Sequence, residues 1–270
     1  MEFTLDFCAI YHYNDSIWKK WEDCILGEVI AVLSGKGGTG KTSVCAAVCT
    51  ALARDGFRVL AIDCDVGLQN LDISLGMSDS GALSFLDVCQ GGYDLSQAAV
   101  HPSFSKLSFL TAPVNRSAED VDQAAFGELL RTAKEQYDYI FLDAPAGIDA
   151  GFFLAAKFAQ RIVLVTLADP AAVRDATRAG QRLELMGKND VRLVVNRVSR
   201  KLFSTLSVTV DDVMDNTGLP LLGVVPADQN VVLAAAFGSP LISYSANRGA
   251  ARACRAIAKR IQGFNTPLSI

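Results

Sequence analysis

The chain lacks the sequence signs of several protein classes. Among its 270 residues there is no run of about 18 apolar residues, so the sequence predicts no membrane-spanning helix. A signal-peptide pattern is missing as well. The seven cysteines include no C-x-x-C pair, which excludes the usual signs of a structural zinc site or a thiol redox site. Their odd number favours free thiols in a reducing compartment, so we expect a cytoplasmic protein.

An excess of positive charge is also missing. The formal net charge is −4 and the pI is about 5.2, a balance that disfavours a protein whose whole surface binds nucleic acid. Half of the residues are hydrophobic, which is enough for a large buried core. There is no internal repeat and no low-complexity tract, so residues 27–270 are predicted to form a single domain.

Residues 1–26 differ from the rest of the chain. They hold both tryptophans and no glycine, and no hydrophobic periodicity organises them. We expect this segment to be an extension outside the domain. It is either a disordered or mis-assigned start of the chain, or an arm that binds a partner.

Short apolar runs alternate with stretches of helical periodicity along the whole domain. The runs are apolar nearly throughout, as is typical of parallel strands that are covered on both faces. The alternation predicts an α/β fold: a doubly wound, mostly parallel sheet of about seven or eight strands with helices on both faces. The predicted strands are 29–33, 58–63, 107–111, 139–143, 161–166, 192–195 and 221–225.

A glycine-rich loop follows the first of these strands directly. It reads Gly-x4-Gly-Lys-Thr, the P-loop pattern, in which converging backbone N–H groups and a helix N-terminus bind phosphate. Lys41 is expected to reach the β- and γ-phosphates, and the Thr42 hydroxyl to ligate Mg²⁺. The predicted nucleotide-binding residues of this segment are Gly35, Lys36, Gly37, Gly38, Thr39, Gly40, Lys41, Thr42 and Ser43.

Carboxylates follow two further strands. Asp63 and Asp65 come at the end of the run 58–63, and Asp143 ends the run 139–143. Since the carboxyl ends of parallel strands meet at one edge of a sheet, these groups are expected to face the ligand. A strand that ends in Asp is a Walker B arrangement, whose carboxylate holds Mg²⁺ through water. Asp63 and Asp143 therefore join Thr42 as candidate metal ligands.

Two later segments have the character of a base-binding site. Asn196 follows the strand 192–195, and its amide offers both a donor and an acceptor to an adenine edge. Further on, Pro226-Ala227-Asp228 follows the last strand. Taken together and in this order, the two segments favour ATP over GTP.

The loop carries an additional lysine, Lys36, which an ordinary P-loop does not need. With it, the motif resembles the deviant Walker A of the MinD/ParA family of dimerising ATPases. Residues 63–72 are similar to the switch I pattern of that family, although Gln69 stands where the family has Arg, and residues 143–147 are similar to its Asp-x-Pro-Ala-Gly switch II. The Pro-x-Asp segment is also similar to the one whose backbone meets the base in that family.

The resemblance covers residues 27 to about 262 and is stronger for the MinD branch. It implies that Lys36 crosses a dimer interface to the nucleotide of a second subunit. It further implies that Asp65 positions the attacking water, with Asp63 supporting the metal shell. The expected catalytic residues are thus Lys36, Lys41 and Asp65, and the expected cofactors are ATP and Mg²⁺.

The same resemblance implies a switch ATPase that positions the cell-division septum as an ATP-dependent homodimer. A MinE-like or other stimulating partner and a septation inhibitor are the implied partners, with nucleic acid not expected. The alternatives are a ParA-type DNA-partitioning ATPase, a flagellar-number regulator of the same family, and a small-molecule ligase or reductase subunit.

Residues 250–262 read as a helix with a basic side and an apolar side. Two interpretations remain open: an interfacial helix that makes weak, peripheral contact with the inner face of the cell membrane, or the final helix of the fold, with Ile257 and Ile261 in the core.

Overall fold

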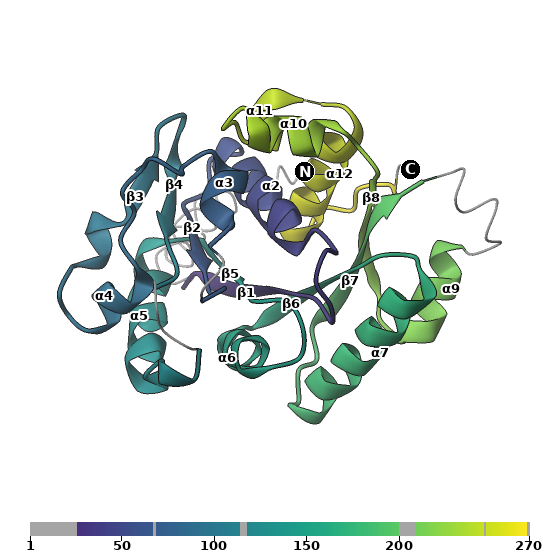
Figure 1. The fold of residues 1–270 in the computed structure, drawn as a ribbon, viewed down its shortest axis with the longest axis horizontal. Coiled ribbons are helices and arrows are strands. Elements are labelled where there is room, and N and C mark those ends of the chain that lie inside the picture. The colour runs from purple at the N-terminus through teal and green to yellow at the C-terminus, as the bar shows by residue number, and fades with distance from the viewer. Residues whose placement is uncertain (1–25, 67–68, 114–117, 200–208, 246, 269–270) are drawn as a thin grey trace, which may run out of the picture.

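The computed structural model describes residues 26–66, 69–113, 118–199, 209–245 and 247–268. The predicted extension, residues 1–26, lies outside the described residues except for Leu26. Within them, one eight-stranded sheet runs through the molecule in the order β3-β4-β2-β5-β1-β6-β7-β8 (Figure 1). The strands are β1 (Glu28–Leu33), β2 (Val59–Asp63), β3 (Ala99–His101), β4 (Phe104–Leu110), β5 (Tyr139–Asp143), β6 (Arg161–Thr166), β7 (Val191–Val198) and β8 (Leu221–Pro226).

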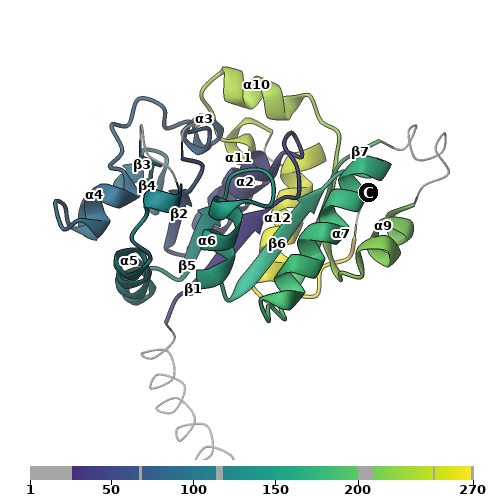
Figure 2. The same cartoon turned by 60° about the horizontal axis from the view of Figure 1, so that its bottom comes forward.

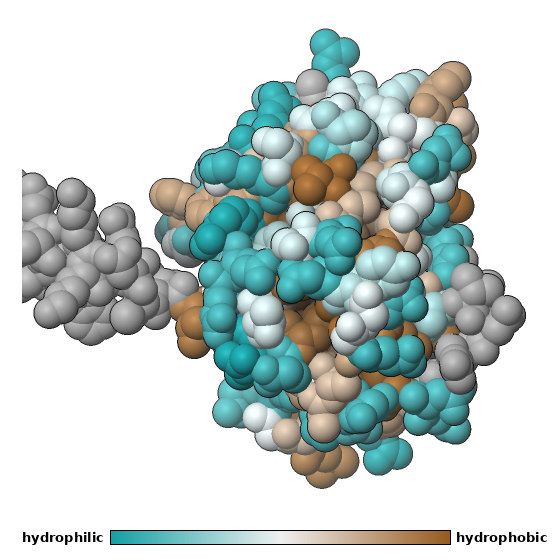
Figure 3. Space-filling model, turned by 90° about the vertical axis from the view of Figure 1, so that its left-hand side faces the viewer, coloured by the Kyte–Doolittle hydropathy of each residue, from teal (hydrophilic) through white to brown (hydrophobic). Residues whose placement is uncertain are grey.

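The predicted doubly wound sheet is confirmed, and each of the seven predicted runs contains a strand. The sequence did not predict β3, the one strand of the sheet that pairs antiparallel. It is three residues long and exposes Val100 at the edge of the sheet, so it has too little apolar patterning to be recognised. Hydrophilic side chains cover much of the molecular face at that edge, with apolar groups between them (Figure 3).

Helices cover both faces of the sheet (Figures 1 and 2). One layer consists of α2 (Lys41–Arg54), α3 (Leu71–Leu75), α10 (Asn230–Ala236), α11 (Leu241–Tyr244) and α12 (Gly249–Ile261). The other consists of α4 (Phe85–Cys89), α5 (Gln123–Gln136), α6 (Ala150–Phe158), α7 (Pro170–Leu185) and α9 (Val210–Thr217), together with the short 3₁₀ turns η1 (Leu95–Gln97) and η2 (Ala118–Asp120).

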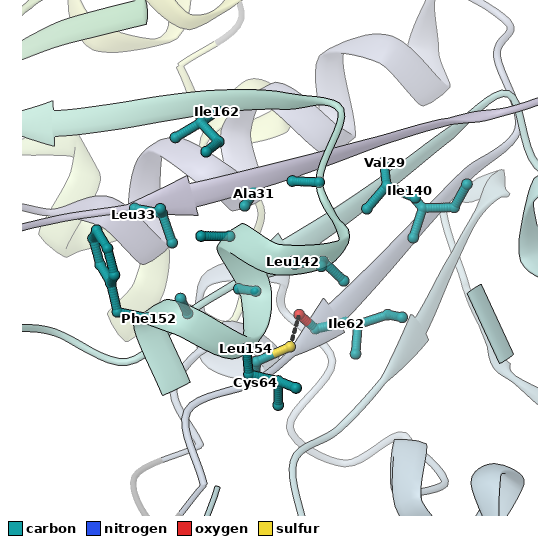
Figure 4. Packing of buried hydrophobic residues seen from close by; sticks show 14 of the residues in the cluster. Val29, Ala31, Leu33, Ile62, Cys64, Ile140, Leu142, Phe152, Leu154 and Ile162 are labelled. Carbon is teal, nitrogen blue, oxygen red and sulfur yellow. Dashed lines mark hydrogen bonds between the residues drawn. The ribbon is translucent and has the colours of Figure 1, made fainter. Parts of the chain in front are cut away.

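The central strand β1 shows how the two layers share one sheet. Val29, Ala31 and Leu33 pack into the core beneath α5 and α6 (Figure 4), whereas Ile30 and Val32 pack into the core beneath α2. Because successive side chains of a strand point to opposite faces, a strand buried on both faces has to be apolar at every position. This burial fixes the carboxyl ends of β1, β2 and β5 side by side at one edge, where the polar residues begin.

The last helix belongs to the core. Ile257 and Ile261 of α12 are 1% and 4% exposed, and Cys254 beside them is buried. The Arg260 guanidinium then donates hydrogen bonds to the carbonyl oxygens of Thr266 (3.1 Å) and Pro267 (2.9 Å), so the described tail folds back onto this helix. The interpretation of 250–262 as the final helix of the fold is therefore confirmed. No helix in the described residues is long and apolar enough to cross a membrane.

Candidate active site

The glycine-rich loop connects β1 to α2, as the pattern predicted. Gly38 (φ 78°) and Gly40 (φ 82°) both adopt the left-handed conformation, which other residues reach only at a cost. Gly40 is the residue before the first turn of α2, and a Cβ atom there would collide with the amide nitrogen of Asn196. The loop therefore needs glycine both for its backbone conformation and for the side chain of Asn196, on β7, to approach.

A buried ion pair lies beneath the loop. The ammonium of Lys41 is 2.7 Å from Asp143 Oδ1, and the two side chains are 6% and 1% exposed. The two residues meet because β1 and β5 are neighbours and Val32 stands in register with Asp143. Burial opposes the charged form of Lys41, but the charge and the hydrogen bond of Asp143, with smaller contributions from Cys45 and Asp65, together outweigh it and raise the pKa of Lys41. The site therefore holds a charged ammonium where phosphate is expected to bind.

Asp63 is next to this pair, in register with Asp143 on the adjacent strand β2. Its two carboxylate oxygens accept the backbone N–H groups of Asp65 (2.8 Å) and Leu71 (3.2 Å), the second of which begins α3. Burial and the charge of Asp143 raise the pKa of Asp63 to about 7. Asp63 thus holds in place the loop between β2 and α3.

Asp65 sits at the edge of the same cluster. It is half-buried, and burial raises its pKa, while the charge of Lys41 acts in the opposite direction. Farther along switch I, the side chain of Gln69 donates a 2.6 Å hydrogen bond to the carbonyl oxygen of Ala112. The MinD/ParA family pattern has Arg at this position. In this chain the uncharged Gln69 instead anchors its segment to the loop after β4.

Lys36 lies apart from the buried cluster. Its ammonium is 3.8 Å from Asp169 Oδ1, and the two side chains are 35% and 39% exposed. The same oxygen of Asp169 accepts the N–H of Ala172 and so caps α7. An exposed ion pair at this distance contributes little. The structure therefore leaves the Lys36 cation accessible at the open edge of the site.

The predicted base-binding residues line a pocket of about 500 Å³ beside the glycine-rich loop. Asn196 donates from Nδ2 to the Thr39 carbonyl (2.7 Å), and Asp228 accepts the N–H groups of Asn230 and Ala250 (both 2.9 Å). These polar groups hold loops and helix ends in place. The lining residues are Gly40, Ser43, Val44, Asn196, Arg197, Val225, Pro226, Ala227, Asp228, Gln229, Val231, Val232, Leu241, Ala250 and Cys254.

Sequence reasoning missed the part of this pocket that comes from residues 231–254. Val231, Ala250 and Cys254 read in the sequence as ordinary core or helix residues, and no local signal distinguishes them. Arg197 could have been noticed, because it directly follows the predicted Asn196.

The donors around Lys41 are suited to a hard cation. The Thr42 hydroxyl lies 3.2 Å from the Lys41 ammonium, so a hydroxyl and a carboxylate already converge on one positive charge. Oxygen donors of this kind fit Mg²⁺, which typically takes one or two protein ligands and completes its shell with water and phosphate. Within the described residues there is no cluster of three or more His, Cys, Asp or Glu side chains that could hold a metal.

Comparisons with known proteins identify the family of this chain. Residues 30–241 match the CobQ/CobB/MinD/ParA nucleotide-binding domain. A septum site-determining protein MinD of Synechocystis is 35% identical over 244 residues, which is 90% of this chain and 92% of that protein. MinD in a MinC:MinD complex of Aquifex aeolicus superposes with a TM-score of 0.83 at 31% identity, covering 90% and 99% of the two chains. MinD of Pyrococcus horikoshii, solved with Mg-ADP, gives 0.77 at 28% identity over 87% and 96%.

The sheet, the loop and the strand-end carboxylates define a P-loop nucleotide-binding protein. The chain belongs to the CobQ/CobB/MinD/ParA family, and the matches place it in the MinD branch of that family. Proteins of the MinD/ParA group within this family are ATPases, and one similar structure is the cell-division ATPase MinD of Pyrococcus furiosus.

The Thr39 hydroxyl leads to a first prediction. It is the buried side-chain oxygen or nitrogen that lacks a hydrogen-bond partner in the described part of the chain. Such a group costs its desolvation, so Thr39→Val should raise the free energy of unfolding by about 1 kcal/mol in urea denaturation. The control is Thr50→Val in α2, where the buried hydroxyl donates to the Ala46 carbonyl at 2.7 Å. That change should lower stability instead, and equal effects at the two positions would contradict the prediction.

Asp63 leads to a second prediction, for the nucleotide-free protein. Its carboxyl ionises near 3.8 when unfolded and near 7 when folded, so between these values the folded state holds the extra proton. The free energy of unfolding therefore falls as the pH rises through this window. We therefore compare the free energy of unfolding of Asp63→Asn with that of the unmodified protein. Between about pH 5 and about pH 8, this difference should change in favour of the variant by more than about 1 kcal/mol.

Asp55→Asn is the matched control for this titration. Burial raises the pKa of Asp55, but hydrogen bonds from Gln262 and Lys259 and the charges of Lys259 and Arg255 together outweigh it and lower that pKa from 3.8. The stabilisation from Asp55 is then lost only in more acidic solution, so Asp55→Asn should show no such shift between the two pH values. If the difference in free energy of unfolding between Asp63→Asn and the unmodified protein did not change with pH, the raised pKa of Asp63 would be refuted.

Proposed function

We propose that this protein is a Mg²⁺-dependent ATPase of the MinD type that helps to place the cell-division septum by dimerising with ATP. The proposal rests on the different environments of two lysines in one loop. Lys41 is enclosed next to Asp143, and Lys36 is accessible at the open edge. The similarity to MinD proteins over about nine-tenths of the chain supports septum placement over the DNA-partitioning and flagellar alternatives.

In this proposal the chain binds the ATP phosphates with the loop N–H groups, the first turn of α2 and Lys41. Mg²⁺, when held by Thr42 and Asp143 with Asp63 behind them, would supply charge neutralisation on the phosphates. Asp65 orients the attacking water, and Lys36 of one subunit stabilises the charge on the nucleotide of the other. Most of the acceleration would come from positioning and electrostatics, as in other phosphoryl transfers.

We further propose that α7 is the surface for protein partners. Arg174, Arg178 and Arg182 stand at four-residue spacing on its exposed side. The last two line a surface hollow together with Leu185 (78% exposed) and Phe153 of α6 (36%). Cations beside exposed apolar groups suit an acidic, partly apolar partner segment. One similar structure is a MinC:MinD complex, which supports a septation inhibitor or a stimulating protein as the occupant.

We propose a cytoplasmic protein with weak peripheral contact at the inner face of the membrane. The described residues after α12 expose Phe264 (58%) and Leu268 (54%). With Arg260 holding its backbone, one copy offers little apolar surface to lipid, and two copies in a dimer would bind better by avidity.

The two loop lysines should give different defects. Lys41→Ala should abolish nucleotide binding, since the phosphates lose their enclosed cation. Lys36→Ala should retain ATP binding but lose ATP-induced dimerisation and about 10³- to 10⁵-fold in turnover, the worth of a cation delivered in trans. Calorimetry, light scattering and phosphate release would measure the three properties. Lys106→Ala at the opposite end of the sheet is the control, and normal dimerisation and hydrolysis by Lys36→Ala would contradict the proposal.

Asp65→Ala should trap the dimer. The variant keeps the loop and both lysines, so ATP still brings two subunits together, but the attacking water loses its acceptor. Turnover should fall by about 10²- to 10⁴-fold, as for loss of a general base, while the dimer persists with ATP in size-exclusion chromatography. Full activity at saturating ATP would remove Asp65 from the catalytic residues.

A further inference from the structure

His101 is a buried histidine at the edge of the sheet, on the strand β3. It is the last residue of that strand and is 3% exposed, whereas Val100 before it is 55% exposed. The register of β3 against β4 shifts between these two residues. An irregular register of this kind re-aims a side chain and is frequent next to active sites. Because the His101 ring is buried, both of its nitrogens need partners within the protein.

Two backbone groups fix the tautomer of this ring. The N–H of Ser103 donates to Nδ1 at 3.0 Å, so Nδ1 is the acceptor. Nε2 therefore carries the proton and donates to the carbonyl oxygen of Leu75 at 2.9 Å. Burial lowers the pKa of His101, while the hydrogen bond to Leu75 acts in the opposite direction, and the ring is neutral at pH 7. His101 thus presents one donor, and that donor holds the last residue of α3.

The helix α3 depends on such anchors to stay in place. It has five residues, and isolated helices of fewer than about 12 residues are marginal in water. Leu71 and Leu75 bury their side chains in the core beneath α2, which holds one face of the helix. The carbonyl of Leu75 lies in the last turn, where no N–H of the same helix reaches it. Without His101 this buried oxygen would lose its bond, so the end of α3 would shift toward another donor or toward solvent.

The other end of α3 leads to the carboxylate that is proposed to orient the attacking water. The N–H of Leu71 donates to one oxygen of Asp63 at 3.2 Å, and the second oxygen of Asp63 accepts the N–H of Asp65 at 2.8 Å. The hairpin of β3 and β4, beside α3 (Figures 1 and 2), is also continuous with Ala112, whose carbonyl accepts a hydrogen bond from Gln69. The described residues between β2 and α3 are therefore held from two sides, by β2 and by the edge hairpin.

We propose that His101 is a positioning residue of the ATPase: by holding the Leu75 carbonyl it fixes α3, and through α3 it sets the place of Asp65. This role rests on the proposed function, since it requires that Asp65 orients the attacking water. Both ring nitrogens are bonded to backbone groups, so His101 acts through α3 and not on the nucleotide. Loss of its donor should lower turnover and leave ATP affinity unchanged, because Lys41 and the loop glycines keep their places.

Two amide variants separate the two ring nitrogens. His101→Asn keeps a polar group near Nδ1 but loses the donor to Leu75, whereas His101→Gln places an amide N–H near Nε2 and can keep that donor. His101→Asn should lower kcat by about 10- to 100-fold, since a displacement of about 1 Å costs up to about 10²-fold. Its affinity for a non-hydrolysable ATP analogue, measured by calorimetry with Mg²⁺, should change by less than about 3-fold. His101→Gln should recover most of the turnover.

A double-mutant cycle with Asp65→Ala distinguishes positioning from a general loss of structure. If His101 acts through Asp65, its donor is worth nothing more once that carboxylate is gone. Single-turnover phosphate release by the double variant His101→Asn, Asp65→Ala should therefore stay within about 3-fold of Asp65→Ala alone. Thr217→Val is the control for a lost buried hydrogen bond. The Thr217 hydroxyl donates to the Val213 carbonyl at 2.9 Å within α9, and its removal should lower stability without changing kcat.

Four results would overturn the inference. Unchanged turnover by His101→Asn would remove its role, and equal losses by His101→Asn and His101→Gln would show that the donor at Nε2 does not carry the effect. Losses that multiply in the double variant would mean that His101 does not act through Asp65. A loss of analogue affinity or of ATP-induced dimerisation as large as the loss of turnover would make His101 a determinant of binding. If the unmodified protein did not hydrolyse ATP with Mg²⁺, the proposed function would fail instead.

Discussion

The buried ion pair between Lys41 and Asp143 is the interaction on which the rest of the site depends. An unpaired charge at either position would carry a desolvation penalty of several kcal/mol, so the two groups have to meet with good geometry. They meet because β5 lies directly between β2 and β1 in the sheet. That order also places Asp63 in register with Asp143, which leaves two carboxylates and one ammonium in a shared enclosure.

The excess of buried carboxylates over ammonium groups explains why the pKa of Asp63 is raised. One cation cannot fully compensate two buried carboxylates, and the pKa of Asp63 accordingly rises to about 7, through burial first and the charge of Asp143 second. An enclosure with surplus negative charge and oxygen donors favours an additional cation, which is a physical reason for a divalent ion to accompany the phosphates. In the nucleotide-free protein, protonation of Asp63 removes part of this surplus negative charge.

The polar side chains at the strand ends share a second property. Asp63 holds the start of α3, Asn196 holds the P-loop, and Asp228 holds the start of α12. Asn196 and Asp228 connect segments that are 157 and 22 residues apart in the sequence, whereas Asp63 bonds to a residue eight positions further along its own loop. Residues whose type indicates ligand chemistry therefore serve here to position the backbone and the neighbours that face the ligand.

These contacts also mark what the sequence could predict. The strand β1, the loop glycines and Asp143 have local signatures, namely an uninterrupted apolar run, fixed spacing and a strand-end carboxylate, and the structure places them as expected. The contact of Lys36 with Asp169 and the contribution of Cys254 to the pocket beside the P-loop join segments that only the fold brings together. No local pattern encodes such pairs, and β3 is too short to have a pattern at all.

The two lysines of the loop illustrate how the fold separates roles that the sequence places five residues apart. Lys41 follows the left-handed Gly40, which turns the chain into α2 and directs its side chain to the enclosed carboxylates. Moving that ammonium away would leave Asp143 buried without a partner, so Lys41 is held strongly until another positive charge replaces it. Lys36 instead pairs at 3.8 Å with an exposed acid, in a contact worth less than about 1 kcal/mol. Since water can replace that contact at little cost, the Lys36 side chain can leave Asp169 while the interior of the site stays intact.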